Sequence, residues 1–437
     1  MFYTLKTSLL ITITVLLGVS SISATDGYFR HGYGIKYSAL AGSGVAVSLS
    51  SLGAISNPAG LIFLDCNDRY DINIAMFSPD RQYSISGTPT LYPGTFGLTP
   101  GTVSSDSKNF FFPTLGGAWK LNSYMAIGLA LYGNGGMNTN YHTATFYDQT
   151  SPGTGVNIEQ MFAAGTYAVK LSQDHAIGVS AIFGWQRFSA QGLSAFANFS
   201  SDPSNLTGNS KSIATGFGGK VGYQGKFGKM LRLGTSFQTK IYMGKFNRYK
   251  GLFADAGDFD VPSTWTVGIA FTPNEQWTLL LDYQQILYSE VKSVGNSMDL
   301  INNSPMLPNG TPNPNYQALG TENGWGFGWK DVSIIKFGVM SKIGNGWTLM
   351  GGYSYNTQPI PESEVMFNIL APAVSQHHIT LGCTKELNQS NELTVEFMYA
   401  PAVSVSGANP LEAPNAQTIE LKMSQFQVEI GYAFSSF

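Results

Sequence analysis

The sequence predicts an all-β fold: a transmembrane, antiparallel β-barrel of fourteen strands, with an N-terminal, partly helical hatch that plugs its lumen. Charged residues make up only 12% of the chain, about half of the ~25% that is usual in a soluble domain. Polar and apolar residues alternate with a period of two over most of the chain, which indicates strands with two unlike faces. The connections between these segments are short and long in turn, as in barrels of the outer membrane.

Residues 1–24 have the pattern of a secretory signal peptide. Lys6 supplies a positive charge, residues 8–19 (SLLITITVLLGV) are apolar, and small residues lead to a predicted cleavage after Ala24. A membrane anchor is the alternative, but the run is shorter than the roughly 20 apolar residues that a spanning helix needs. We therefore expect export, with the mature chain in the outer membrane of a Gram-negative cell.

Two stretches illustrate the alternation. In residues 277–287 (WTLLLDYQQIL), Trp277 and Leu281 share one face, whereas Asp282 lies on the other. Residues 231–246 follow the same pattern, which places Ile241 and Met243 on the outward, apolar face. We predict fourteen such strands, at residues 69–80, 110–121, 124–133, 158–171, 175–191, 212–225, 231–246, 262–271, 277–288, 332–342, 347–356, 375–385, 392–400 and 417–434.

The connections favour a barrel over a soluble sandwich, which would also show many strands. Every second connection is a short turn, such as residues 122–123 or 343–346, and the others are long, up to residues 289–331. A sandwich does not predict this rhythm, whereas tight periplasmic turns and long outer loops do. Closure also pairs the backbone N–H and C=O groups at every strand edge. This matters because each unpaired backbone group in lipid costs several kcal/mol.

The last strand and the aromatic residues support the same topology. The chain ends on Phe437, and a terminal aromatic strand is the kind of signal that the barrel-assembly machinery reads. The phase of the alternation slips near residues 424–425, which we interpret as a β-bulge. A girdle at the membrane interface is predicted for aromatics at segment ends, namely Trp119, Tyr124, Tyr132, Trp185, Trp277, Tyr288, Trp347 and Tyr353.

Residues 25–68 precede the first strand and do not alternate. They are rich in Gly, Ala and Ser but carry many apolar residues, which argues against a disordered tail. Fourteen strands enclose a lumen too wide for their own side chains to fill. We therefore expect residues 25–68 to be a plug of short helices inside a barrel formed by residues 69–437.

Part of this segment resembles a known family. Residues 42–61 (GSGVAVSLSSLGAISNPAGL) are similar to the N-terminal hatch of the FadL family of outer-membrane long-chain fatty-acid and hydrocarbon transporters. Residues 329–332 (WKDV), 346–349 (GWTL) and 355–382 resemble later parts of the same family, so the resemblance spans the mature chain. The hatch motif maps onto Asn57, Pro58, Ala59 and Gly60.

The resemblance implies a monomeric barrel without a continuous water channel. A hydrophobic ligand is expected to bind first at the outer loops, then at an inner site, and to leave sideways after the hatch moves. The third strand should carry a kink in the wall, at Gly128 or at Gly133 with residues 135–136, although loop glycine is the alternative for the latter. The expected ligands are long-chain fatty acids or, by the same route, aromatic or aliphatic hydrocarbons.

Apolar residues on two outer loops are candidates for ligand contact, because exposed apolar groups on loops need a reason. They could instead pack the loops on one another. The candidates are Leu193, Phe196, Phe199, Leu206, Tyr249, Leu252, Phe253 and Phe259.

A fatty-acid headgroup would need a cation in the lumen. Five cationic side chains are expected to face the lumen. The position of Arg30 in the hatch and the phase of the strands for the others indicate this; the five are Arg30, Lys220, Arg232, Lys240 and Lys336. Asp282, Glu396 and Glu429 also face inward, so each cation could simply neutralise a neighbouring acid. A neutral hydrocarbon would require no cation.

Other functions find less support. The net charge of −3 lacks the basic footprint of a nucleic-acid-binding protein. We find no nucleophile elbow, no metal-spaced cluster and no cofactor motif, so an enzyme is not expected, and His377 and His378 face opposite sides of a strand. Nothing in the sequence pairs Cys66 with Cys383. A general diffusion porin and a structural or adhesin barrel remain the competing classes.

Overall fold

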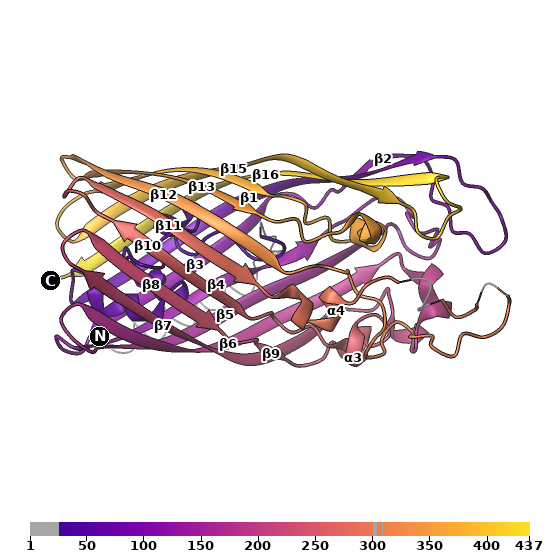
Figure 1. Cartoon of the computed structure of the whole chain (residues 1–437), viewed down its shortest axis with the longest axis horizontal. Coiled ribbons are helices and arrows are strands. Elements are labelled where there is room, and N and C mark those ends of the chain that lie inside the picture. Colours follow the sequence, from indigo (N-terminus) through magenta and orange to yellow (C-terminus); the bar gives the residue numbers. More distant parts are fainter. Residues whose placement is uncertain (1–25, 300–303, 308) are drawn as a thin grey trace.

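The computed structural model of the protein describes residues 26–299, 304–307 and 309–437. The described strands form one antiparallel sheet that closes on itself, because the first strand, β1 (Asp68–Gly87), pairs with the last, β16 (Gln417–Ser436). Figure 1 shows the strands tilted around a cylinder whose right-hand end is extended by loops. The predicted signal peptide lies outside the described residues.

Each of the fourteen predicted segments is a strand of the barrel, which confirms the predicted fold. The strands between β1 and β16 are β3 (Phe110–Lys120), β4 (Met125–Asn138), β5 (Gly155–Lys170), β6 (His175–Gln191), β7 (Ser212–Phe227), β8 (Leu231–Gln238), β10 (Thr264–Phe271), β11 (Trp277–Ile286), β12 (Val332–Gly344), β13 (Trp347–Asn356), β14 (His377–Glu386) and β15 (Asn391–Ala408). Two short strands lie off the wall, β2 (Gly101–Ser104) against β1 and β9 (Tyr242–Met243) against β7.

The long loops gather at one end of the barrel and the short turns at the other, as predicted (Figure 1). The helices in the described parts of the loops are all short: η3 (Ser194–Phe199), η4 (Pro203–Asn205), η5 (Asn247–Tyr249), α3 (Ala254–Gly257), η6 (Tyr288–Glu290), α4 (Lys292–Gly295), η7 (Glu362–Glu364) and η8 (Phe367–Ile369). None of the helices in the described ranges has the length and apolar character needed to cross a membrane.

The predicted bulge in the last strand is wrong. β16 alternates without interruption, and its pairing with β1 is continuous. The register shift lies instead on β15, between Ala400 and Val403. The apparent slip has a physical cause: within the membrane the apolar side chains of β16 face lipid, whereas beyond it Ile419 and Leu421 face inward and pack under the outer loops.

The same change of environment explains the seventh predicted strand, residues 231–246, which was too long. β8 ends at Gln238, and Ile241, Met243 and Phe246 are buried in the core of the loops rather than facing lipid. The alternation of polar and apolar residues therefore continues beyond the membrane, but there the apolar side chains pack against protein instead of lipid.

Residues 26–67, which we call the N-terminal segment, run inside the barrel. The segment contains α2 (Ile35–Ser38), η1 (Ser51–Ile55) and η2 (Pro58–Phe63), each a short helix of six residues or fewer. Nearly all of its side chains are buried, and η2 lies against β5, β6 and β7. The partly helical character expected for residues 25–68 agrees with this arrangement.

The predicted aromatic girdle is only partly correct. Tyr124, Trp277, Trp347 and Tyr353 are exposed on the outer face, and Trp119 and Trp185 are partly exposed. Tyr132 and Tyr288, however, are buried inside the barrel, and Tyr288 contacts the N-terminal segment.

Candidate functional site

Glycines of the barrel wall make room for the N-terminal segment. A Cβ atom added at any of ten inward-facing glycines would approach an atom of this segment to less than 3.0 Å, a distance that real Cβ atoms do not tolerate. Several of these glycines face one another across neighbouring strands, as Gly178 and Gly222 do. The ten are Gly116, Gly128, Gly178, Gly222, Gly234, Gly268, Gly338, Gly352, Gly382 and Gly431.

The motif Asn57-Pro58-Ala59-Gly60 sits on one of these glycine pairs. Asn57 caps η2, because its Oδ1 accepts a hydrogen bond from the backbone N–H of Ala59 at 3.1 Å. Its Nδ2 donates to the carbonyls of Val45 (2.8 Å) and Tyr223 (2.9 Å), and so ties the segment to β7. The motif is thus a fixed point of contact between segment and wall.

Three of the five predicted lumen cations meet inside the barrel. Arg30, Lys220 and Lys336 line one internal cavity of about 30 Å³, together with Asp282, which is room enough for a water-sized polar group. They come from three different elements: the N-terminal segment, β7 and β12. All are largely enclosed, with Arg30 and Lys336 each 4% exposed.

Buried carboxylates lie beside two of these cations. Arg30 forms an ion pair with Glu429 of β16 at 3.0 Å, and its guanidinium also lies over the ring of Phe112. Lys336 is 3.9 Å from the carboxylate of Asp26 and donates to the carbonyl of His31. Burial raises the pKa of Asp26 to about 6, although the Lys336 ammonium opposes the rise.

The third cation and the unpaired donors of Arg30 are the remaining polar features of this cavity. Lys220 donates to the carbonyl of Ile55 in the N-terminal segment. Nε and Nη1 of Arg30 have no hydrogen-bond acceptor among the described residues. Buried N–H groups of a guanidinium are costly to leave unpaired. Both oxygens of Asp26 and one oxygen each of Asp282 and Glu429 also have no hydrogen-bond donor among the described residues, so the network holds unpaired donors and unpaired acceptors.

The other two predicted cations lie elsewhere. Arg232 faces the lumen at the end with the short turns, where it lines a cavity of about 450 Å³ with Lys342 and Glu275. Lys240 follows the end of β8, lies 3.9 Å from Asp260 and donates to the carbonyl of Glu290. The predicted inward position of Lys240 depends on a strand over residues 231–246, whereas β8 ends at Gln238.

The eight apolar loop residues are packed, not exposed. Seven of them are buried and Phe199 is half-buried. One group surrounds Phe188, whose ring contacts those of Tyr249 and Phe253 at 4.8 and 4.6 Å between centroids. Elsewhere, the ring of Phe196 contacts that of Phe146, and the ring of Phe199 contacts that of Trp325. The described arrangement thus matches the loop-packing alternative, and ligand contact stays a prediction.

These loop residues are continuous with the N-terminal segment. A single apolar core contains Phe253 and Phe259 of the loops as well as Tyr28, Phe29 and Leu52 of the segment. The rings of Tyr28 and Phe259 are 5.9 Å apart, and Tyr28 is also close to Tyr288 and Trp329. An apolar path therefore connects the outer loops with the charged cavity beneath.

The wall is incomplete between β3 and β4, the second and third strands of the barrel. Their pairing ends at Leu115 and Leu131, although β4 continues to Asn138. The register of β4 with β5 shifts between Gly133 and Gly135, so Asn134 is an extra residue in β4. Tyr33 of the N-terminal segment donates to the side-chain oxygen of Asn134 at 2.6 Å. The irregularity thus lies at the second of the two predicted positions, whereas Gly128 is regularly paired.

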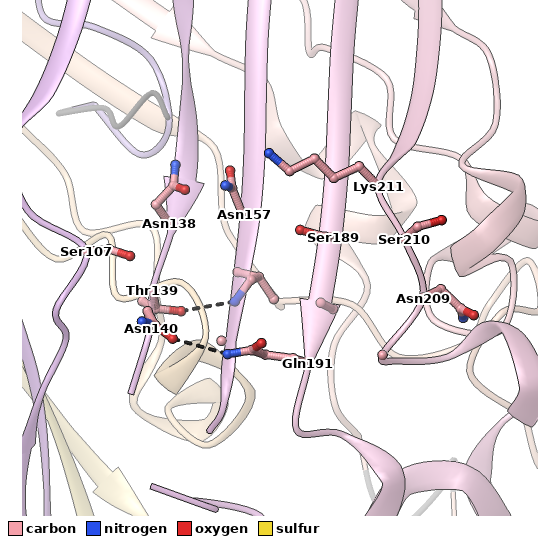
Figure 2. A pocket seen from close by; sticks show the side chains of 14 residues that line it. Ser107, Asn138, Thr139, Asn140, Asn157, Ser189, Gln191, Asn209, Ser210 and Lys211 are labelled. Carbon is pink, nitrogen blue, oxygen red and sulfur yellow. Dashed lines mark hydrogen bonds between the residues drawn. The ribbon is translucent and has the colours of Figure 1, made fainter. Parts of the chain in front are cut away.

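A polar recess of about 450 Å³ opens beside this gap, on the outer ends of β4 to β7. Nine of its fourteen lining residues carry an amide or a hydroxyl group. Figure 2 shows these side chains and the hydrogen bond from Gln191 to Asn140, which is 3.1 Å long. Lys211 is its cationic lining residue.

Several residues of the inner site were not anticipated. Asp26, His31 and His378 lie together in the lumen, with the two imidazoles stacked at 5.9 Å and Asp26 3.9 Å from His378. The glycines facing the segment were also missed. Their signal was glycine at polar-face positions of many strands, which is visible only once strand phase is assigned.

Comparisons with known proteins agree with this geometry. A family model described as outer membrane protein transport protein (OMPP1/FadL/TodX) matches residues 31–429. No curated protein matches the chain. The solved structure of the P. putida toluene transporter TodX superimposes with a TM-score of 0.66 at 17% identity, covering 93% of this chain and 99% of that one. A Pseudomonas aeruginosa FadL homologue gives 0.66 at 14% identity (94% and 100%), and the Ralstonia pickettii toluene transporter TbuX gives 0.61 at 16% (93% and 99%). At these identities the solved structures establish the fold.

Proposed function

Since the chain belongs to the OMPP1/FadL/TodX family of outer-membrane transport proteins for hydrophobic compounds, we propose that its substrates are long-chain fatty acids. The observation that carries this proposal is the meeting of Arg30, Lys220 and Lys336 at one cavity below a continuous apolar core. An acyl chain gains free energy from apolar surroundings, and a carboxylate gains from charge-assisted hydrogen bonds. The acyl chain of a fatty acid thus matches the apolar core, and its carboxylate matches the charged cavity below.

The route would begin at the outer loops and end at the gap in the wall. The loop aromatics, including Phe253 and Phe259, would separate to admit the chain, and the headgroup would then reach Arg30. Tyr33 and Arg30 both contact the extra residue of β4, since the backbone N–H of Arg30 donates to the carbonyl of Asn134 at 3.2 Å. Movement of the N-terminal segment would therefore act directly on the edge of the gap and open a lateral exit to the membrane.

A neutral hydrocarbon is the second candidate, and one observation favours it. Arg30 has Glu429 as a partner, and Lys336 has both Asp26 and Asp282 nearby. These carboxylates would repel a second carboxylate and would leave a neutral ligand unaffected.

Binding of two ligands with the same chain and different headgroups separates the candidates. Oleate and oleyl alcohol would be titrated into the purified protein and into its Lys220→Met variant, with tryptophan fluorescence as the readout. A charged hydrogen bond contributes about 1.5–3 kcal/mol, so oleate should bind roughly tenfold or more weakly to the variant while oleyl alcohol is unchanged.

The exposed Lys250 offers a matched control, and Lys250→Met should bind both ligands like the unmodified protein. Equal effects of Lys220→Met on both ligands would favour neutral substrates. Absence of binding for both ligands would contradict transport of hydrophobic compounds itself.

A further inference from the structure

The outward face of the barrel changes from apolar to polar at a sharply defined level on β5 and β6. Met161 and Trp185 are cross-strand partners and the last apolar pair of this face. The next outward pair along the strands is Glu159 and Arg187, followed by Asn157 and Ser189. Below Trp185, outward residues of β6 such as Phe183 are exposed to the lipid region. Because tryptophan marks the membrane interface, the polar pairs lie at the level of the lipid headgroups.

The recess occupies this level on the side of the long loops. Figure 2 shows Lys211 extending across the outer face of β6 toward Asn157, with Ser189 between them and Asn138 beyond. These four residues come from four neighbouring parts of the wall: β4, β5, β6 and the residue before β7. Amide and hydroxyl groups thus surround one ammonium group in a hollow of about 450 Å³.

The charges of Glu159, Arg187 and Lys211 sum to one positive charge, and the carboxylate of Asp106, next to Ser107, contacts His142. Arg187 forms an ion pair with Glu159, whose side chain is only 3% exposed, and its guanidinium lies over the ring of Trp185 at 5.7 Å. Lys211 is 3.8 Å from Glu159, with 48% of its side chain exposed. Arg187 already neutralises Glu159, so the exposed ammonium of Lys211 can attract an anion.

We propose that the recess binds the phosphorylated sugar headgroup of a glycolipid in the outer leaflet of the membrane. Amides and hydroxyls donate to and accept from sugar hydroxyls, and the ammonium of Lys211 pairs with a phosphate. Phe183 and the ring of Phe217 beside it, 5.3 Å apart, lie on the lipid-facing wall below and contact the acyl chains. A bound glycolipid would lie directly beside the gap between β3 and β4.

Binding of a glycolipid to variants of the recess tests this assignment independently of the transported substrate. Diphosphoryl lipid A in detergent micelles would be bound to the full-length protein and measured by native mass spectrometry. Lys211→Glu reverses the charge of the recess, and Ser189→Phe fills it while leaving every charge in place. Lys250→Glu, on an outer loop with the same exposure of its side chain (46%), is the matched control.

We expect lipid A to bind about fivefold or more weakly to Lys211→Glu, since one cation near a membrane surface contributes about that factor. Ser189→Phe should also weaken binding, because it fills the recess, and the control should bind unchanged. Equal binding by all variants would overturn the proposal. Equal binding of phosphatidylglycerol would show attraction of any anionic lipid, and would also overturn it. Competition by free glucosamine 1-phosphate at the concentrations of lipid A would identify a soluble sugar phosphate as the ligand, against the membrane source.

Discussion

At the scale of single residues, the seat of the N-terminal segment depends on the absence of side chains. Gly178 of β6 and Gly222 of β7 are directly opposite each other, and the backbone of Pro58 and the side chain of Asn57 lie against them. A side chain at either position would occupy the volume of the motif. Glycine here permits a close approach between wall and segment.

Gly222→Ala should therefore displace the motif. The added Cβ would lie 2.1 Å from Oδ1 of Asn57, and overpacking of this kind costs about 1–3 kcal/mol. We expect assembly of the barrel to persist, as a heat-modifiable band on electrophoresis, while oleate affinity and uptake change. Gly219→Ala on the same strand is the control, because its Cβ would meet only the carbonyl oxygen of Ser180 at 3.6 Å. Loss of the folded band in Gly222→Ala would mean that the seat is needed for assembly.

A second prediction at this scale concerns a cluster of acidic residues in an outer loop. Burial raises the pKa of Asp258 to about 6, and the carboxylates of Asp260 and Asp255 add to the rise. The folded loop therefore binds a proton more tightly than the unfolded chain, whose aspartates titrate near 3.9. By linkage, stability of the loop is highest below about pH 4 and is lost as the pH rises through 6.

The rate of cleavage in this loop by a nonspecific protease tests the sign. Between pH 5 and pH 7.5, the loop of the unmodified protein should become easier to cleave than that of Asp258→Asn, compared at each pH so that the protease's own pH dependence cancels. At pH 7.5 the variant should be the more resistant of the two. If the ratio of the two cleavage rates, unmodified protein to variant, were the same at both pH values, the pKa of Asp258 would not be raised in the folded loop.

At the scale of elements, β4 combines two properties that the proposed exit requires. Its outer half is unpaired with β3 and instead meets the N-terminal segment, through a bridge between Phe29 and Gly135. Asn134 interrupts the register of β4 with β5. The same residue contacts Tyr33 and donates to Gln160 of β5 at 3.0 Å. A bulge next to an unpaired edge ends pairing and redirects side chains, and here the extra residue lies just beyond the last pair of β3 and β4.

Deletion of Asn134 should restore the register of β4 and extend its pairing with β3. We expect release of ligand, measured as uptake of labelled oleate by cells, to fall several-fold while binding to the purified protein is retained. Asn134→Ala is the control, because it removes the side-chain contacts and keeps the extra residue. If deletion and substitution reduce uptake equally, the contacts of Asn134 and not the bulge are responsible.

The strands also show where prediction from sequence succeeds. All fourteen were located, since alternation reports only the two environments on either side of a strand. Errors arose where one environment changed along a strand, as at Ile419 in β16 and Ile241 after β8. Beyond the membrane the outer face of the strand meets water, and its inner face meets the packed loops instead of a polar lumen. Apolar side chains therefore face inward at these positions.

At the scale of the whole molecule, the N-terminal segment and the loop core fill the barrel. The cavity that Arg30, Lys220 and Lys336 share between segment and wall measures about 30 Å³, far less than a hydrated ion pathway requires. The larger cavity of about 450 Å³ lies at the end with the short turns. In planar lipid bilayers the intact protein should therefore give no large steady ionic current. The double variant Gly178→Ala/Gly222→Ala should show intermittent openings. A large steady current from the unmodified protein would instead support the porin alternative.

The sequence by itself determined the closed barrel, the strand number, the arrangement of turns and loops, and the segment that lies ahead of the wall. Each of these follows from local periodicity, length and composition. Only the tertiary structure decided that Arg30, Lys220 and Lys336 share a cavity while Lys240 does not, and that the loop aromatics are packed. Those outcomes depend on contacts between residues far apart in the chain, such as Arg30 with Glu429, and no periodicity encodes them.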